Sequence, residues 1–370
     1  MNLQATTSKK SSLFERVEQY LPQVTKPGRY VGGEYNQVNK DWHAVRTHVA
    51  LIFPDIYDIG QPNLGLAILY DILNRQDDIC AERAYAPWLD MERILREQQL
   101  PLYGLESKRP LDEFDILAFT LPYEAIYTNV LNILDLSGLP LFSTERDENT
   151  PLVIAGGQAA FNPEPMSAFI DAFVIGEGEE VILEVVQAHQ AWKDSHRSRQ
   201  ELLEALADID GVYVPSLYQV SYNPDGTVAE ILPKSPQAKM PVIKRIVASL
   251  PEPLTNFLVP NVDVVHNRIS VEIMRGCTRG CRFCHAGMVN RPIRERSVDE
   301  VIQAIDASLK ATGYEQVGLL SLSSSDHSQI VQIVQEVYAH FKDARVNVSL
   351  PSLRIASFSV DLMDQLQELR

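Results

Sequence analysis

The sequence predicts an α/β protein in two parts, a doubly wound parallel sheet followed by the first three β/α units of a second parallel structure. Three observations predict this fold. Apolar strands alternate with amphipathic helices along most of the chain, the strands lack the period-two pattern of a half-exposed sheet, and glycines gather where several strands end. Parallel strands joined by helices are covered on both faces, which makes such strands apolar throughout.

Residues 46–200 are expected to form the doubly wound domain. Its strands are predicted at 48–55, 78–87, 115–123, 152–157 and 171–180. A helix is predicted at 63–74, where Leu64, Ile68 and Ile72 recur at helical spacing, and further helices follow the third and fifth strands. Residues 1–45 are expected to be an extension with a short helix and a turn-rich stretch.

Residues 201–268 break this alternation, and residues 269–370 resume it. The first segment has short β-like runs, a turn at Pro224–Gly226 and recurring prolines, which are typical of a hairpin and a connector. In the second segment, strands are predicted at 268–276, 316–323 and 345–352, each followed by an amphipathic helix. Three such units are too few to close a barrel, so we expect this part to be incomplete.

The composition bounds the class of protein. With 370 residues, 45% of them hydrophobic and 22% charged, the chain is typical of a globular protein with two cores. No run approaches the roughly 20 apolar residues of a membrane span, and the first residues lack the apolar core of a signal peptide. Four cysteines exclude a disulfide framework, so we expect a reducing cytoplasm. The net charge of −16 argues against a chain that wraps nucleic acid.

Three of the four cysteines, Cys277, Cys281 and Cys284, fall within the stretch "CTRGCRFC". One interpretation is a structural zinc site with His285 as the fourth ligand, because Cys80 lies in the other predicted domain. Closely spaced thiolates also suit an iron–sulfur cluster. Three protein ligands on a four-iron cluster leave one iron open, and an open metal position is where chemistry takes place.

In this stretch the sequence resembles the radical S-adenosylmethionine (SAM) superfamily, whose Cys-x3-Cys-x-aromatic-Cys loop follows the first strand of a β/α barrel. Phe283 stands at the aromatic position. The resemblance implies that Cys277, Cys281 and Cys284 ligate a [4Fe-4S] cluster and that SAM binds its fourth iron. Reductive cleavage of SAM would then give a 5′-deoxyadenosyl radical that acts on an unknown substrate. The resemblance also implies an electron-donor protein such as flavodoxin or ferredoxin.

A second motif of the superfamily, a Gly-Gly-Glu-like turn after the second strand, binds the amino group of SAM. The corresponding stretch is "LSLSSSDHS", where Ser323 and Ser324 offer hydroxyls and backbone carbonyls in place of the glycines and glutamate. The alternative at this place is a helix N-cap around Ser325 and Asp326. After the third strand, Arg354 is expected on the active face, either as a contact to a carboxylate or substrate or in a structural salt bridge.

The N-terminal domain resembles the Rossmann-like, cobalamin-binding-type domain that precedes the radical domain in one branch of the superfamily. The stretches "PNLGLAILYDIL", "LVIAGG" and "DAFVIGEGEE" carry this resemblance. Cobalamin proteins place a cobalt-ligating histidine in an Asp-x-His-x-x-Gly loop; here Asp55 and Gly60 keep the frame, but Tyr57 replaces the histidine. A phenol does not substitute for a neutral imidazole, so cobalamin either binds without a protein lower ligand or has been lost while the fold is kept.

Four glycines at strand ends complete the possible cobalamin-type site. Gly156, Gly157, Gly176 and Gly178 would let the backbone approach a nucleotide tail. The alternative is that they serve tight strand-to-helix turns.

Six arginines between Arg275 and Arg296 make the cysteine segment locally cationic. They permit an RNA or phosphate-bearing substrate. The favoured interpretation is that they pair with acidic residues such as Glu295, Asp299 and Glu300.

Nearly the whole chain, from "GRYVGGEYN" to "SLSSSD", resembles an uncharacterised, widespread bacterial family of radical SAM proteins with a cobalamin-binding-like N-terminal region. Members of that family are longer. We therefore expect a truncated chain or half of a split protein, with a partner chain completing the barrel. The alternative function is a non-catalytic iron–sulfur or cobalamin-type binding module, or an inactive fragment, that works with a partner.

Overall fold

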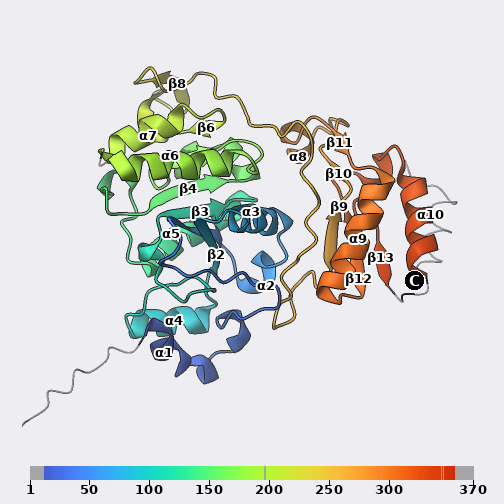
Figure 1. Ribbon diagram of the computed structural model, residues 1–370. Coiled ribbons are helices and arrows are strands. Elements are labelled where there is room, and N and C mark those ends of the chain that lie inside the picture. The colour runs from blue at the N-terminus through green and yellow to red at the C-terminus, as the bar shows by residue number, and fades with distance from the viewer. Residues whose placement is uncertain (1–11, 196, 343, 345, 355–370) are drawn as a thin grey trace, which may run out of the picture.

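Two α/β units lie side by side in the computed structural model and are joined by a long extended segment (Figure 1). The structure describes residues 12–354 except 196, 343 and 345. The helix that the sequence predicts near residues 360–369 lies outside the described residues. Within the described part of the chain, no helix is both long and apolar enough to cross a membrane.

The first unit contains a six-stranded sheet in the order β2-β1-β3-β4-β5-β6. Strands β1 to β5 are mutually parallel, and β6 runs antiparallel to β5 at one edge. The strands are β1 (Thr47–Phe53), β2 (Ile79–Tyr85), β3 (Ile116–Thr120), β4 (Leu152–Gly156), β5 (Ala172–Val174) and β6 (Val212–Tyr213). This order confirms the predicted doubly wound parallel sheet.

Helix α1 (Leu13–Glu18) precedes the first strand of this unit, and the other α-helices lie between its strands. These are α2 (Tyr57–Gly60), α3 (Leu64–Asn74), α4 (Leu89–Glu97), α5 (Tyr127–Leu136), α6 (Val181–Ser195) and α7 (Arg199–Ala207). Helix α4 is not among the elements predicted from the sequence; it buries Met91, Ile94 and Leu95 against the core. The sheet continues past residue 200, because α7 leads into β6 within the segment that we expected to be hairpin and connector.

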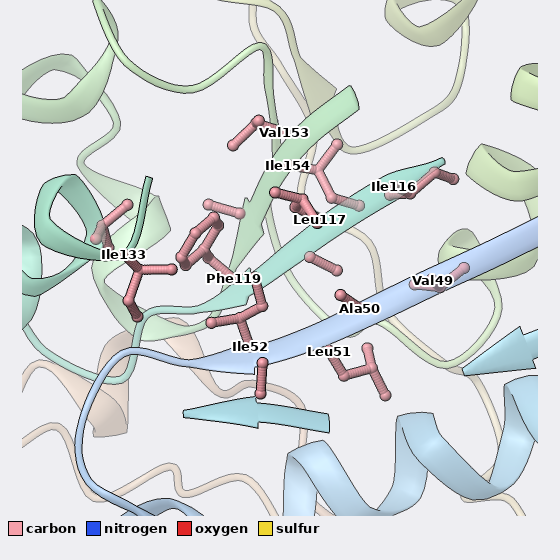
Figure 2. Packing of buried hydrophobic residues seen from close by; sticks show 14 of the residues in the cluster. Val49, Ala50, Leu51, Ile52, Ile116, Leu117, Phe119, Ile133, Val153 and Ile154 are labelled. Atoms are coloured by element: carbon pink, nitrogen blue, oxygen red, sulfur yellow. The ribbon is translucent and has the colours of Figure 1, made fainter. Parts of the chain in front are cut away.

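Consecutive buried residues show that both faces of the first sheet are covered. Val49, Ala50, Leu51 and Ile52 follow one another along β1, and each is at most 1% exposed. Neighbouring side chains in a strand point to opposite faces, so a run of this kind needs helices on both sides. Figure 2 shows these residues with those of β3 and β4, and Ile133 of α5. The apolar runs in the sequence therefore correspond to strands whose two faces are both buried.

A buried ionic cluster joins the N-terminal extension to this core. The Arg83 side chain is 1% exposed and lies on β2. Its guanidinium pairs with Glu106, 2.8 Å from Nε to Oε1, and with Glu34 of the extension. Glu34 also accepts a hydrogen bond from the Tyr57 hydroxyl. Burying a charge costs desolvation energy, and only its buried partner of opposite charge offsets that cost. Removal of any one member of the cluster would therefore leave an uncompensated buried charge.

The second unit contains a three-stranded parallel sheet in the order β13-β12-β9. Its strands are β9 (Ile269–Glu272), β12 (Gln316–Leu320) and β13 (Asn347–Ser349). The predicted strand at 268–276 is split: β9 ends at Glu272, and β10 (Met274–Arg275) pairs antiparallel with β11 (Arg294–Glu295). The helices are α8 (Ala286–Val289), α9 (Val298–Thr312) and α10 (Ile330–Phe341). These elements match the predicted β/α alternation.

The segment between the two units begins with an antiparallel hairpin of β7 (Tyr218–Tyr222) and β8 (Val228–Pro233). Residues 234–268, which we call the connector, then pass between the units (Figure 1). The connector pairs with both ends of the first unit, through a bridge of Arg245 to Gly176 and one of Val259 to Tyr35. It is therefore packed along its course rather than a free linker.

Removing the charge of Arg83 tests the buried cluster. Arg83→Met leaves the carboxylates of Glu34 and Glu106 buried without their cation, and we expect it to lower the free energy of unfolding by about 3–5 kcal/mol. Urea unfolding followed by tryptophan fluorescence measures this, since the three tryptophans all precede residue 193.

The matched control is Arg75→Met, which removes an ion pair between the exposed Arg75 and the partly exposed Asp71. This change is expected to cost less than about 1 kcal/mol. Equal losses in the two variants would contradict a structural role for the buried cluster.

Candidate functional site at the junction of the two units

A cavity of about 440 Å³ lies where the two units meet. Its wall in the first unit comes from the carboxyl ends of β3, β4 and β5 and from the first turns of α3 and α6, with Phe119 and Ile154 among the apolar side chains. Its wall in the second unit comes from Glu272 at the end of β9, from Met274 in the next strand and from Leu320 at the end of β12. The size is that of a small-molecule site, and crevices at the carboxyl ends of parallel strands are where ligands bind in α/β folds.

The four glycines named from the sequence all line this cavity. At two of these four positions, close contacts with neighbouring backbone atoms require glycine. Gly157 has φ +109°, and a Cβ there would lie 2.6 Å from the carbonyl oxygen of Leu121. Gly176 has φ +116°, and a Cβ would lie 2.2 Å from the carbonyl oxygen of Arg245 in the connector. Tight packing of backbone on backbone therefore accounts for these two glycines, and they also open the wall of the cavity.

The Asp55 to Gly60 loop does not line the cavity. Tyr57 is 2% exposed, with its ring against Tyr85 and its hydroxyl donating to Glu34. Burial next to Glu34 raises the pKa of the Tyr57 phenol far above its ordinary value, so the hydroxyl stays protonated. Of the residues named for a cobalamin-type site, the structure thus gathers the glycines and separates Asp55, Tyr57 and Gly60 from them.

The cysteine loop borders the cavity with its two ends, whereas none of its three cysteines lines the cavity. Gly276 before the first cysteine and Asn290 after the last both line the cavity, and the Cys277 amide donates to the Asn290 carbonyl over 3.2 Å. Cys281 is exposed, and Cys277 and Cys284 are half-buried. Sulfur Sγ of Cys284 accepts a hydrogen bond from the Gly287 amide at 3.4 Å. The loop thus closes on itself beside the cavity.

The three thiols are close in sequence, but their side chains do not converge to form a metal-binding cluster. Among the residues that the structure describes, no group of three or more His, Cys, Asp or Glu side chains is arranged to hold a metal ion. The ring of His285, the candidate fourth ligand for zinc, packs edge-on against Phe161 of the first unit at 6.4 Å between centroids. Phe283 is 93% exposed.

Ser323 and Ser324 are buried in the loop after β12. The Ser323 hydroxyl donates to Asp326 at 2.7 Å, and the Ser324 hydroxyl donates to the Pro351 carbonyl at 2.7 Å. Both hydroxyls are thus engaged within the second unit, while the neighbouring Ser321 and Leu322 line the cavity. The alternative N-cap is wrong: helix α10 begins at Ile330 after Gln329, which makes no side-chain cap.

Asp326 connects three loops at the carboxyl edge of the second sheet. It accepts hydrogen bonds from Arg279 of the cysteine loop, 2.8 Å from Nε to Oδ2, and from Arg354 after β13 at 2.9 Å. The hydrogen bonds from Arg279 hold the pKa of Asp326 well below its ordinary value. Arg354 therefore takes part in a structural salt bridge, one of its two predicted roles. Sequence analysis missed Asp326 as a hub, because its partners lie 47 and 28 residues away.

Four of the six arginines of the cysteine segment form ion pairs with carboxylates, as favoured from the sequence. Of the acids expected from the sequence, Glu300 pairs with Arg296 at 3.8 Å. Arg275 pairs with Glu272 at 2.8 Å and with Glu179 at 2.6 Å, and Arg294 pairs with Glu177. Burial raises the pKa of Glu177, but hydrogen bonds from Arg294 and from a backbone amide outweigh burial and lower it. The principal partners thus lie on another strand or in the first unit.

Comparisons with known proteins agree with this architecture. Residues 65–215 match the model of the N-terminal domain of radical SAM proteins, and residues 271–370 match the radical SAM superfamily. The uncharacterized protein MJ0966 of Methanocaldococcus jannaschii is 24% identical over 321 residues, which are 85% of this chain and 57% of the relative. The chain thus spans just over half the length of this curated relative.

Two solved structures of the radical SAM methyltransferase TsrM from Kitasatospora setae share the fold at 15% identity. One holds tryptophan substrate and the SAM analog aza-SAM, with a TM-score of 0.52 over 88% of this chain and 58% of TsrM. The other holds cobalamin and a [4Fe-4S] cluster, with a TM-score of 0.51 over 88% of this chain and 57% of TsrM. Residues 65–215 and 271–370 thus match the two domains of radical SAM proteins, an N-terminal domain followed by the radical SAM domain, and the chain shares the fold of TsrM.

Proposed function

We propose that this chain is a radical SAM enzyme whose cysteine loop holds a [4Fe-4S] cluster and whose substrate binds in the cavity between the two units. One observation carries the proposal: Gly276 and Asn290, at the two ends of the cysteine loop, both line that cavity. When bound, the cluster and SAM supply a 5′-deoxyadenosyl radical by one-electron reductive cleavage. A loop that opens onto a cavity of small-molecule size suits such chemistry.

The donor set of the loop fits an iron–sulfur cluster. Three thiols on one short loop are the soft ligands that iron–sulfur clusters take. Arg279 lies between Cys277 and Cys281 in the sequence, and its guanidinium pairs with Asp326. The thiols need to converge on binding, and metal binding commonly supplies that order. The exposure of Cys281 leaves room for this movement.

The loop after β12 is the proposed place for SAM. Ser321 and Leu322 line the cavity across from the first unit, and Ser323 and Ser324 follow directly. Since the hydroxyls of Ser323 and Ser324 are already engaged, we assign the contact to backbone groups of this loop. Asp326 holds this loop, the cysteine loop and Arg354 together and so orients them for SAM.

The apolar lining of the cavity supports both water exclusion and a substrate without phosphate. Phe119, Ile154 and Leu320 line it, and a dry pocket protects reactive intermediates from side reactions. Arg275, which lines the cavity, and Arg294 are both paired with carboxylates, which weakens the argument for an RNA or phosphate-bearing substrate. We expect a substrate that is mostly apolar.

For the first unit we propose cobalamin binding without a protein ligand below the cobalt. The fold is shared with TsrM, one structure of which holds cobalamin. The glycine turns of β4 and β5 line the cavity, whereas Tyr57, at the place of the histidine, is buried beside Glu34. Among the described residues, the lining of this cavity includes no histidine.

Two partners complete the proposal. Exposed Cys281 and Phe283, with Arg279 half exposed, present the loop to an electron donor such as flavodoxin or ferredoxin. The three described strands of the second sheet are fewer than a barrel requires, and a partner chain that supplies further strands would complete it.

Anaerobic reconstitution tests the cluster and its chemistry. The chain is loaded with iron and sulfide, reduced, and supplied with SAM, and 5′-deoxyadenosine is measured by chromatography. We expect 5′-deoxyadenosine from the wild type, and we expect Cys281→Ala to lose most of the cluster absorbance because one of three ligands is gone.

The control is Cys80→Ala, which removes a buried thiol of the first unit and is expected to keep the absorbance. An intact cluster that yields no 5′-deoxyadenosine would favour the non-catalytic binding module. Unchanged absorbance in Cys281→Ala would exclude this ligand assignment.

Asp326→Asn tests how the three loops are held. The change weakens the ion pairs with Arg279 and Arg354, and we expect the free energy of unfolding to fall by about 1–3 kcal/mol. Urea titration followed by far-ultraviolet circular dichroism measures this. The control Asp306→Asn removes an exposed pair with Lys310 on α9 and is expected to cost less than about 0.5 kcal/mol. Equal effects of the two changes would contradict the hub.

Cobalamin binding is tested with hydroxocobalamin, gel filtration and the visible spectrum of the retained cofactor. We expect the wild type to retain cobalamin and Gly178→Leu to retain much less, because the new side chain enters the cavity beside Leu69. Tyr57→Phe is the control and is expected to retain as much as the wild type, since Tyr57 faces the core. A colourless wild-type chain would refute cobalamin binding, and a loss in Tyr57→Phe would refute the placement.

A further inference from the structure

We infer that Glu177 is a positioning residue that ties the cysteine loop of the second unit to the glycine turn of the first. The inference rests on the proposed function only for the role of the cysteines. The contacts themselves link the turn after β5 to the ribbon of β10 and β11, from which the cysteine loop projects.

Glu177 receives contacts from two parts of the chain that are distant in sequence. Its Oε2 accepts hydrogen bonds from Nη1 of Arg294 at 2.7 Å and from the amide of Val247 in the connector at 2.7 Å. Its Oε1 accepts a second bond from Arg294, which makes the pair bidentate. The side chains of Glu177 and Arg294 are 14% and 10% exposed. A bidentate, mostly buried pair fixes direction as well as distance.

The ribbon carries both ends of the cysteine loop. Arg275 of β10 and Arg294 of β11 are direct partners in the antiparallel register. Residues 276–293, which include all three cysteines of the loop, connect them. Arg275 adds pairs to Glu179 at 2.6 Å and to Glu177 at 3.7 Å. Carboxylates of one turn in the first unit therefore hold the base of the loop on both of its strands.

The connector secures the same loop from another side. Nζ of Lys244 donates to the carbonyls of Val289 at 2.7 Å and of Arg291 at 2.6 Å. The next residue, Arg245, pairs through its backbone with Ile175 and Glu177. The turn that contains Glu177 is thus bonded to the ribbon, to the connector and, through the connector, to the end of the cysteine loop.

The charge balance makes Glu177 critical for this arrangement. Arg294 has Glu177 as its ion-pair partner and the Val247 carbonyl as a further acceptor. Neutralising Glu177 leaves a mostly buried guanidinium without its carboxylate, which costs far more than the loss of an exposed pair. The first unit keeps its own apolar core, so we expect the ribbon of β10 and β11 to shift rather than the first unit. The cysteine loop would then move relative to the cavity.

Hydrogen–deuterium exchange of the whole chain without added metal tests this inference. In Glu177→Gln we expect amides of residues 277–291 to exchange about tenfold faster or more than in the wild type, which corresponds to about 1.4 kcal/mol. Amides of β1 and β3 should exchange at the wild-type rate. Glu177→Asp, which keeps the carboxylate, should restore part of the protection. Because no cluster is needed, this result is independent of whether the proposed function holds.

The matched control is Glu180→Gln. Glu180 lies in the same turn, is half exposed and pairs with Arg245 at 3.3 Å, so its neutralisation should change exchange of the loop by less than about twofold. Should Glu177→Gln fail to fold, Arg294→Gln breaks the same pair from the other side and is expected to give the same exchange pattern. Wild-type exchange in the loop, or equal acceleration in β1 and β3, would overturn the inference.

A spectroscopic measurement follows in the reconstituted protein. We expect the electron paramagnetic resonance g values of the reduced cluster to differ between Glu177→Gln and the wild type when SAM is added, and to agree between Glu180→Gln and the wild type. A purely structural role would lower the yield of folded protein without changing the g values. Identical g values in Glu177→Gln would therefore count against a positioning role.

Discussion

Parallel strand pairing is the constraint on which the rest of this molecule depends. In a parallel sheet every strand ends at the same edge, so the loops that follow the strands are gathered there. β4 and β5 bring their glycine turns to one such edge; β12 brings the serine loop, and β9, followed by β10, brings the cysteine loop to another. The two edges meet at the cavity. The faces of the first sheet are covered by helices, which leaves its edge as the place for a site.

Charge pairing then determines how the two edges meet. The first unit contributes Glu177 and Glu179 from a single turn, and the second contributes Arg275 and Arg294 from a single ribbon. These side chains are largely buried, so their attraction is screened less than that of a surface pair. Asp326 performs a similar task within the second unit, where it joins the loops after β12 and β13 to the cysteine loop. Arginines that suggested an anionic substrate thus serve the architecture.

Much of the fold could be predicted because its evidence is local. The run from Val49 to Ile52 is apolar without alternation, and the helical spacing of Leu64, Ile68 and Ile72 marks α3. The division of the predicted strand at 268–276 was not visible, because the residues that end β9 and begin β10 remain apolar or charged without a turn signal. The site was predictable only in part: the glycines reach the cavity, but Tyr57 matches a motif in sequence while its side chain belongs to the core.

The sequence by itself determined the parallel α/β class, the cysteine loop and the family to which that loop points, because periodicity, glycine placement and cysteine spacing are properties of neighbouring residues. Only the tertiary structure decided which of these residues meet. Glu177 and Arg294 are 117 residues apart, and Arg279 and Asp326 are 47 residues apart. Ion pairs of this kind depend on where two chain segments pack in space, which no local pattern encodes. The cavity, its glycine wall and the carboxylates that hold the cysteine loop are products of that packing.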